Sequence, residues 1–207
     1  PHRIHFAAAR GPLAVAAHVL GTTTFLEATA AEPEATQAAL EANVPAWLAA
    51  VQARNFDAAR DVLTALSRLA ERNPGLRPMV GELQWLGDLE QLIAERGGAD
   101  APIRIYADEG RIAAVVERWN INTGERQRTL ARIASHVPAF AAVHADALTH
   151  LRKLQSDATV YLPAIERLKS AIAAELGRDS AQSIAGTLDA FAAKYPGVAG
   201  LDALRQD

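Results

Sequence analysis

The sequence predicts an all-α fold, built from antiparallel helical hairpins that form a bundle or a short right-handed stack. Apolar residues recur every three or four positions through most of the chain, as they do on the buried face of a helix. Alanine, the strongest helix former, is abundant, whereas aromatic residues make up 5% of the chain. Glycine and proline fall between the apolar stretches, where they end and begin helices.

The composition is that of a globular protein, with 207 residues, of which 50% are hydrophobic and 22% charged. We predict a single all-helical domain over residues 1–207, with a division into two subdomains, 1–98 and 99–207, as an alternative. The absence of cysteine excludes disulfides, cysteine nucleophiles and thiolate metal sites. A formal net charge of −3 argues against a nucleic-acid-binding protein.

No stretch of the sequence approaches the roughly 18 uninterrupted apolar residues that a transmembrane helix needs. The apolar segment 6–26 is interrupted by charged and helix-breaking residues and lacks the order of a signal peptide. We therefore expect no transmembrane segment in this chain. The expected location is the bacterial cytoplasm or periplasm, between which the sequence does not decide.

Proline residues are predicted to open three helices in the first quarter of the chain. A helix N-terminus tolerates proline because its first amides have no acceptor within the helix. The three predicted helices cover residues 12–20, 33–40 and 45–55.

The clearest helix is predicted for residues 56–72, and the next one for 78–96. The residues expected to face inward in the first are Phe56, Ala59, Val62, Leu63, Leu66 and Leu69. Those expected to face inward in the second are Met79, Leu83, Leu86, Leu89 and Ile93. A Pro-Gly pair at 74–75 ends the first helix and a Gly-Gly pair at 97–98 ends the second.

The remaining chain is predicted to contain one extended stretch and five helices. Alternating apolar residues predict the extended stretch at 103–106. The predicted helices cover about 108–120, 125–137, 138–155, 157–176 and 179–193, followed by a short turn at 199–205. Asp108, Asp157 and Asp179 are the predicted N-caps, and Pro163 is expected to start or kink its helix.

Two distant segments close with the same pattern, FDAARDVLTALSRLAERNPGL at 56–76 and RDSAQSIAGTLDAFAAKYPGV at 178–198. An alignment without gaps superposes their apolar positions and their prolines: Val62 on Ile184, Leu66 on Leu188, Leu69 on Phe191 and Pro74 on Pro196. We predict that each segment is the second helix of an antiparallel hairpin, ended by a Pro-Gly turn that redirects the chain.

The segment AWLAAVQARNFDAARDVLTALSRLAERNP, residues 46–74, resembles a tetratricopeptide-like helical hairpin. Trp47 lies in its first helix, Phe56 and Ala59 begin its second, and Pro74 closes it. LDAFAAKYPGV at 188–198 resembles the end of another such unit. The resemblance implies stacked helical hairpins and a surface that binds peptides.

The sequence contains no phosphate-binding glycine-rich loop and no G-x-S-x-G, H-E-x-x-H or calcium-loop motif. Asp146 and His150 are four residues apart on a predicted helix, with His144 half a turn away. Such a pair can bind a metal or orient a base, but it is more often a surface ion pair or hydrogen bond. We expect no catalytic residue, no bound metal and no cofactor.

One basic stripe is a candidate binding surface. Arg128, Arg132 and His136 step by four along a predicted helix, with Arg118 and Arg126 nearby. Such a stripe could hold an acidic peptide, a phosphate or an anionic lipid head group. The alternative is a helix face that is simply solvated.

We expect a non-catalytic protein-interaction or scaffold module that binds a protein or peptide partner, including an acidic one, in a groove between hairpins. It could form the soluble part of a larger or membrane-anchored bacterial protein. A first alternative is a small-ligand sensor with a pocket between helices lined by Trp85, Tyr106 and Trp119, although the tryptophans are more typical of core anchors. A second is a helical-bundle enzyme that uses scattered residues such as Asp146 and His150.

Overall fold

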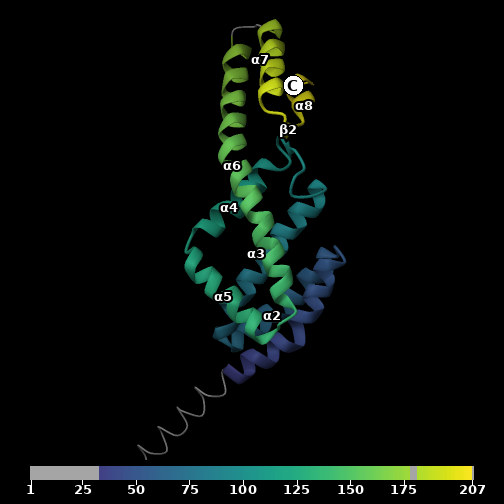
Figure 1. Cartoon of the computed structure of the whole chain (residues 1–207), viewed down its shortest axis with the longest axis vertical. Helices are drawn as coiled ribbons and strands as arrows, with labels where there is room; N and C mark the ends of the chain where they lie inside the picture. Colours follow the sequence, from purple (N-terminus) through teal and green to yellow (C-terminus); the bar gives the residue numbers. More distant parts are fainter. Residues whose placement is uncertain (1–32, 178–180, 207) are drawn as a thin grey trace, which may run out of the picture.

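The computed structural model describes residues 33–177 and 181–206 and confirms the predicted all-α fold. Helices make up 83% of it and pack around a hydrophobic core. The molecule is elongated, and the long helix α6 (Phe140–Leu176) runs from the end that holds α2 to the end that holds α7 (Figure 1). The predicted helix at 12–20 and the predicted cap Asp179 lie outside the described residues.

Residues 33–52 form a single helix, so the predicted break between 40 and 45 is wrong. Pro45 lies inside this helix and removes one backbone hydrogen bond. The buried face nevertheless continues past it in steps of three and four: Leu40, Val44, Trp47, Leu48 and Val51. Burial of this continuous face outweighs the break that proline favours.

The helix α2 (Phe56–Arg72) confirms the prediction for 56–72. The Asn55 side chain caps it by accepting a hydrogen bond from the Ala58 amide at 3.2 Å. Its buried residues are Ala59, Leu63, Leu66 and Ala70. Leu69, predicted to face inward, is 42% exposed because it lies about 100° around the helix axis from Ala70.

A short 3-10 turn, η1 (Pro74–Leu76), leads into α3 (Arg77–Arg96), as the proline pattern predicts. The residues of α3 that were expected inside are all buried: Met79, Leu83, Leu86, Leu89 and Ile93. α3 is the central helix of the fold, since α2, α4, α5 and α6 all pack against it. Gly97 ends it with a φ of 89°, a left-handed conformation that favours glycine.

The strand β1 (Ile103–Arg104) covers the first half of the stretch predicted to be extended at 103–106. The second half of that prediction is wrong, because residues 105–106 form a turn in which Tyr106 has a φ of 66°. α4 (Glu109–Asn120) and α5 (Thr123–His136) follow, close to their predicted positions. Asn122 joins them with a φ of 57°, a left-handed conformation that asparagine adopts more readily than most residues.

Asp108 stands at the N-cap position of α4, but its side chain makes no capping hydrogen bond. It is fully buried and accepts hydrogen bonds from the amide, Nε and Nη2 of Arg104, at 2.9, 3.0 and 2.7 Å. The Nε atom of Arg96 lies 3.7 Å from the same carboxylate, and neither side chain is exposed. This ionic cluster, in which Asp108 and Arg96 are buried and Arg104 is partly exposed, joins the C-terminus of α3 to β1 and to the start of α4.

α6 continues through 37 residues, so the predicted helix start at Asp157 is wrong. Asp157 is buried within α6 and pairs with Lys153 at 2.5 Å. Pro163 also lies inside α6 instead of starting a helix. The buried residues continue on both sides of this proline, which explains why the helix does not end there: Leu151, Leu154, Ala164, Ile165 and Leu168.

The chain closes with α7 (Ala181–Lys194), β2 (Val198–Ala199) and α8 (Leu201–Gln206). β2 pairs in parallel with β1, and the Ile103 amide donates to the Gly197 carbonyl at 2.8 Å. A Cβ on Gly197 would lie 2.5 Å from the Tyr161 ring of α6, so only glycine fits without a shift of that ring. The short turn predicted at 199–205 is the helix α8.

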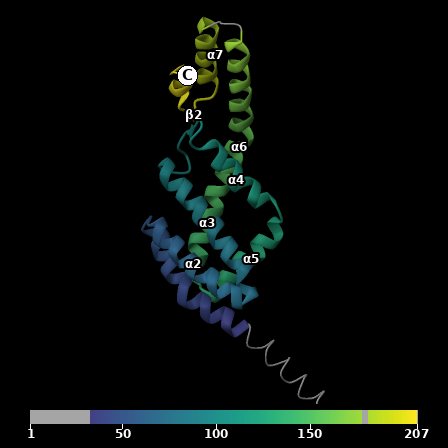
Figure 2. The ribbon, with the colours of Figure 1, turned by 180° about the vertical axis from the view of Figure 1, so that it is seen from behind.

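The repeated pattern at 56–76 and 178–198 corresponds to the same hairpin position. α2 comes after the helix of residues 33–52 and a short turn, and α7 returns beside the C-terminal half of α6 (Figures 1 and 2). Each is therefore the second helix of a hairpin. The two hairpins differ in the element that comes next, because the first Pro-Gly pair leads into α3 and the second leads into β2.

Within residues 33–177 and 181–206, no helix combines the length and the apolar character needed to cross a membrane. The division into subdomains 1–98 and 99–207 stays a prediction. α3, which ends before this boundary, packs against α4, α5 and α6, which lie after it in the chain.

Candidate functional site

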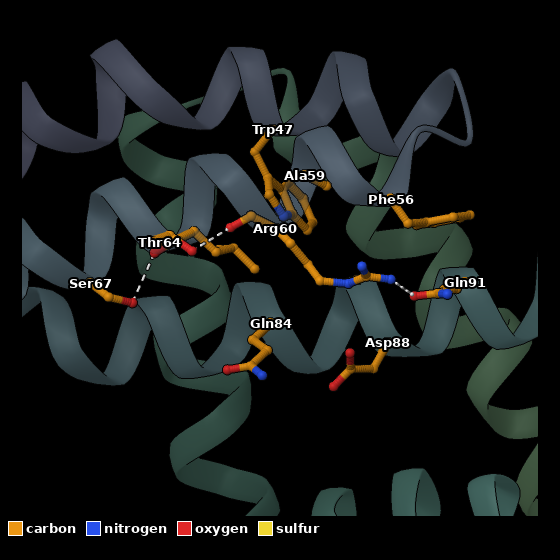
Figure 3. Close-up of a pocket in the computed structure, with 11 residues that line it drawn as sticks. Trp47, Phe56, Ala59, Arg60, Thr64, Ser67, Gln84, Asp88 and Gln91 are labelled. Atoms are coloured by element: carbon orange, nitrogen blue, oxygen red, sulfur yellow. Dashed lines mark hydrogen bonds between the residues drawn. The ribbon is translucent and has the colours of Figure 1, made fainter.

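An open groove lies where α2, α3 and the helix of residues 33–52 meet (Figure 3). Its volume is about 220 Å³. Eleven residues line it: Trp47, Phe56, Ala59, Arg60, Leu63, Thr64, Ser67, Gln84, Gly87, Asp88 and Gln91. Trp47 comes from the helix of residues 33–52, and the other ten come from α2 and α3.

The floor of the groove is apolar. The indole of Trp47 is fully buried and reaches toward α2 beside Ala59 (Figure 3). Leu63, four residues after Ala59, also lines the groove. A Cβ on Gly87 would lie 3.7 Å from Cζ2 of Trp47, so glycine leaves the floor open on the α3 side. The indole nitrogen of Trp47 has no hydrogen-bond acceptor within the described part of the chain.

Two rows of polar side chains form the rims of the groove. Arg60, Thr64 and Ser67 follow α2 in steps of four and three, and on α3 the same steps occur: Gln84, Asp88 and Gln91. Residues with this spacing share one face of a helix. The two rows therefore face each other across the apolar floor.

At one end of the groove a side-chain hydrogen bond joins the two rims, whereas at the other end Ser67 donates to the Leu63 carbonyl of its own helix. Arg60 pairs with Asp57 at 2.6 Å and donates to Oε1 of Gln91 at 3.2 Å, and Gln91 donates to Glu95 at 2.6 Å. At the other end, the exposed carboxamide of Gln84 has no hydrogen-bond partner among residues 33–177 and 181–206. A carboxamide offers both a donor and an acceptor to a ligand.

Asp88 is the negative charge of the groove. Its side chain is half-exposed, and its closest basic partner is Nη1 of Arg118, 4.0 Å away. Partial burial raises the pKa of Asp88, and this effect outweighs the opposing charges of Arg118, Arg60 and Arg111. A partly desolvated carboxylate whose ion-pair distance is as long as 4.0 Å favours a ligand that brings a hydrogen-bond donor to it.

The sequence analysis does not single out Gln84, Gly87 or Asp88. One signal could have found the groove: Gly87 lies inside a helix, where glycine costs about 1 kcal/mol relative to alanine. A glycine at such a position often keeps space for a neighbouring group. Here that space is the α3 side of the groove.

Asp146 and His150 lie on α6, where they line a second pocket, and the structure brings a second acidic residue, Glu90, to them. Nδ1 of His150 is 3.0 Å from Oε1 of Glu90 on α3. His144 stacks on Phe140, and burial lowers the pKa of its imidazole. In the ranges that the structure describes, no group of three or more His, Cys, Asp or Glu residues could hold a metal ion.

The structure divides the predicted basic stripe into two parts. Arg126 binds both carboxylate oxygens of Glu82 at 2.9 Å, and Arg118 donates to the Gly81 carbonyl at 2.7 Å. Arg128 and Arg132 are exposed on α5 and have no ion-pair partner among the described residues, and His136 is half-buried at the end of this helix. The binding role of the stripe stays a prediction, in which Arg128 and Arg132 are the available charges.

Trp85 and Trp119 stack on each other in the core, with ring centroids 4.9 Å apart. Trp85 is fully buried and its indole donates to the Val115 carbonyl at 3.1 Å. Tyr106 is 57% exposed, and Nζ of Lys169 lies 4.8 Å from the centre of its ring. The two tryptophans thus fill the space between α3 and α4, and Tyr106 lies at the surface.

Comparisons of this chain with protein-family models, with curated proteins and with solved structures gave no match.

Proposed function

We propose that this chain is a non-catalytic protein-interaction module that binds an extended peptide segment of its partner in the groove between α2 and α3. The observation that carries the proposal is the pair of facing polar rows above an apolar floor. An extended peptide needs both features, because its side chains alternate in direction while its main chain offers donors and acceptors along its length.

The dimensions of the groove suit a short segment. Gln84 and Gln91 are seven residues apart on α3, which corresponds to about 10 Å along the helix axis. An extended chain covers about 10 Å in three residues. We therefore expect a core of three residues, in which one apolar side chain lies over Trp47 and Leu63.

The polar contacts depend on the groups that the fold leaves available. The Gln84 carboxamide would bind a main-chain amide and carbonyl of the peptide, and Asp88 would accept a hydrogen bond from an amide or a basic side chain. The residues that line the groove include no histidine and no cysteine. This lining supports recognition of a ligand better than it supports proton transfer or nucleophilic attack.

A substitution that fills the groove tests this proposal. Peptides selected from a random display library on the wild-type protein should bind Gly87→Gln at least tenfold more weakly, because the new side chain would project over Trp47. Fluorescence anisotropy with the selected peptides measures the affinities. The Tm of the variant should not fall below that of the wild type, since glutamine favours a helix more than glycine does.

Gly186→Gln on α7 is the matched control, because Gly186 is also a helical glycine and no atom beyond its own stretch of helix lies within 4 Å of its Cβ position. This variant should bind the peptides like the wild type. Selected peptides that bind Gly87→Gln as tightly as the wild type would exclude the groove as the binding site. A library that yields no binding peptide would argue against peptide binding as such.

A further inference from the structure

A second pocket lies on the other side of Phe56, between the turn after residue 52, α3 and α6. Its volume is about 350 Å³, which is within the range of pockets that bind small molecules. Part of its wall is apolar: Val51, Phe56, Ile93, Ala94, Ala99 and Val143. Phe56 also lines the groove, so the two sites adjoin without sharing a charged residue.

Charges of opposite sign line this pocket from different elements. Arg54 lies in the turn after the helix of residues 33–52, whereas Asp146 and His150 come from α6 and Glu90 from α3. Within residues 33–177 and 181–206, neither Arg54 nor Asp146 has an ion-pair partner. Of these four described side chains, His150 and Glu90 form a hydrogen bond with each other. A cation and an anion are thus both available to a ligand.

The backbone of Arg54 adds a second, independent observation. Its φ is 57°, and its amide donates to the Val51 carbonyl while the Asn55 amide donates to the Ala50 carbonyl, at 2.9 and 2.8 Å. These two bonds form the motif in which glycine usually ends a helix.

The end of α3 uses the same pair of bonds, and there the left-handed residue is Gly97. An arginine in this conformation costs about 1 kcal/mol or more relative to glycine. Among the described residues its guanidinium has no hydrogen bond or ion pair that would offset this cost, and strained residues of this kind cluster at binding sites.

We propose that this pocket binds a small zwitterion with an apolar substituent, the chemistry of a free α-amino acid. Its carboxylate pairs with Arg54, its ammonium group lies between Asp146 and Glu90, and its side chain packs against Phe56, Ile93 and Val143. A simple cation would leave Arg54 unused, and a simple anion would face two carboxylates. This proposal does not depend on peptide binding in the groove.

Thermal unfolding of the wild-type chain with each of the twenty standard L-amino acids, one at a time, tests the proposal. At least one amino acid with an apolar side chain should raise Tm, because a ligand that binds the folded state stabilises it. Calorimetry should then show at least tenfold weaker binding of two analogues of that amino acid, one without the ammonium group and one without the carboxylate. The proposal is overturned if no amino acid raises Tm or if both analogues bind as well as the amino acid.

Variants identify the site. Arg54→Gly should lower the affinity for that amino acid at least tenfold while its Tm without ligand stays at or above the wild-type value, since glycine relieves the backbone strain. Asp146→Asn should lower the affinity similarly. Arg68→Ala and Asp61→Asn, which change exposed charges on α2, should bind like the wild type. Wild-type affinity in Arg54→Gly would overturn the assignment of the carboxylate site.

Discussion

Trp85→Ala should lower the free energy of unfolding by about 3–5 kcal/mol, the range observed when a large aromatic side chain is removed from a core. Trp85 is fully buried and stacks on Trp119, and its indole donates to the Val115 carbonyl. The substitution removes the stacking partner of Trp119 and leaves a cavity between α3 and α4. Urea unfolding followed by circular dichroism measures the loss.

Two controls separate packing from other effects of this substitution. Trp85→Phe loses the hydrogen bond to Val115 but keeps an aromatic ring and most of the buried volume. It should therefore lower the free energy of unfolding less than alanine does. Leu69→Ala should change the free energy of unfolding by about 0.5 kcal/mol or less, because Leu69 is 42% exposed. A loss below about 1 kcal/mol for Trp85→Ala would mean that this ring is not a core anchor.

Asp108→Ala should cost about 3–5 kcal/mol, the range found when one partner of a buried ion pair is removed. Neither Asp108 nor the side chain of Arg96 is exposed, and Arg96 would keep its charge without a carboxylate 3.7 Å away. Arg104 would lose three hydrogen bonds as well. Chemical unfolding at neutral pH measures the effect.

The pH dependence of the free energy of unfolding provides a second measure of how much the Asp108 carboxylate stabilises the fold. Burial by itself raises the pKa of Asp108, but the hydrogen bonds and charge of Arg104 and the charge of Arg96 lower it below the ordinary 3.8. The stabilisation is therefore present above pH 3.8 and is lost as the pH falls through the lower folded-state pKa. In Asp108→Ala the free energy of unfolding should therefore fall less than in the wild type as the pH is lowered through this range.

A double variant checks the origin of this energy. Arg96→Met in the Asp108→Ala background should recover part of the lost stability, because it removes the unpaired buried charge. Equal stability of Asp108→Ala and the wild type at neutral pH would show that the carboxylate does not hold the cluster together.

Local signals predicted where most helices lie, and long-range packing decided where the predictions were wrong. The pattern of apolar residues and the Pro-Gly and Gly-Gly pairs placed α2 and α3 correctly. Asp157 was predicted to cap the start of a helix, but it pairs with Lys153 inside α6. Whether a proline such as Pro45 or Pro163 breaks a helix depends on the apolar face that continues past it, which other elements cover.

The candidate site was less accessible to prediction, because it is made by pairs of residues that are far apart in sequence. Arg126 binds Glu82, 44 residues away, so a stripe that looked free along one helix is partly used by the fold. Trp47 and Gly87 form the groove only when α3 packs against the hairpin made by residues 33–52 and α2. The expectation of a groove between hairpins came from the tetratricopeptide-like pattern, and that pattern does not specify the residues that line it.

The central claim, that a peptide binds between α2 and α3, is tested most directly by ¹H–¹⁵N NMR titration of the labelled chain with a peptide selected on it. The chain has three tryptophans, so the indole N–H signals are few and can be assigned by substitution. We expect the largest shifts at the indole N–H of Trp47, the amide of Gly87 and the side-chain amide of Gln84. Shifts that cluster instead around Arg128 and Arg132 on α5, with Trp47 and Gly87 unchanged, would contradict the claim.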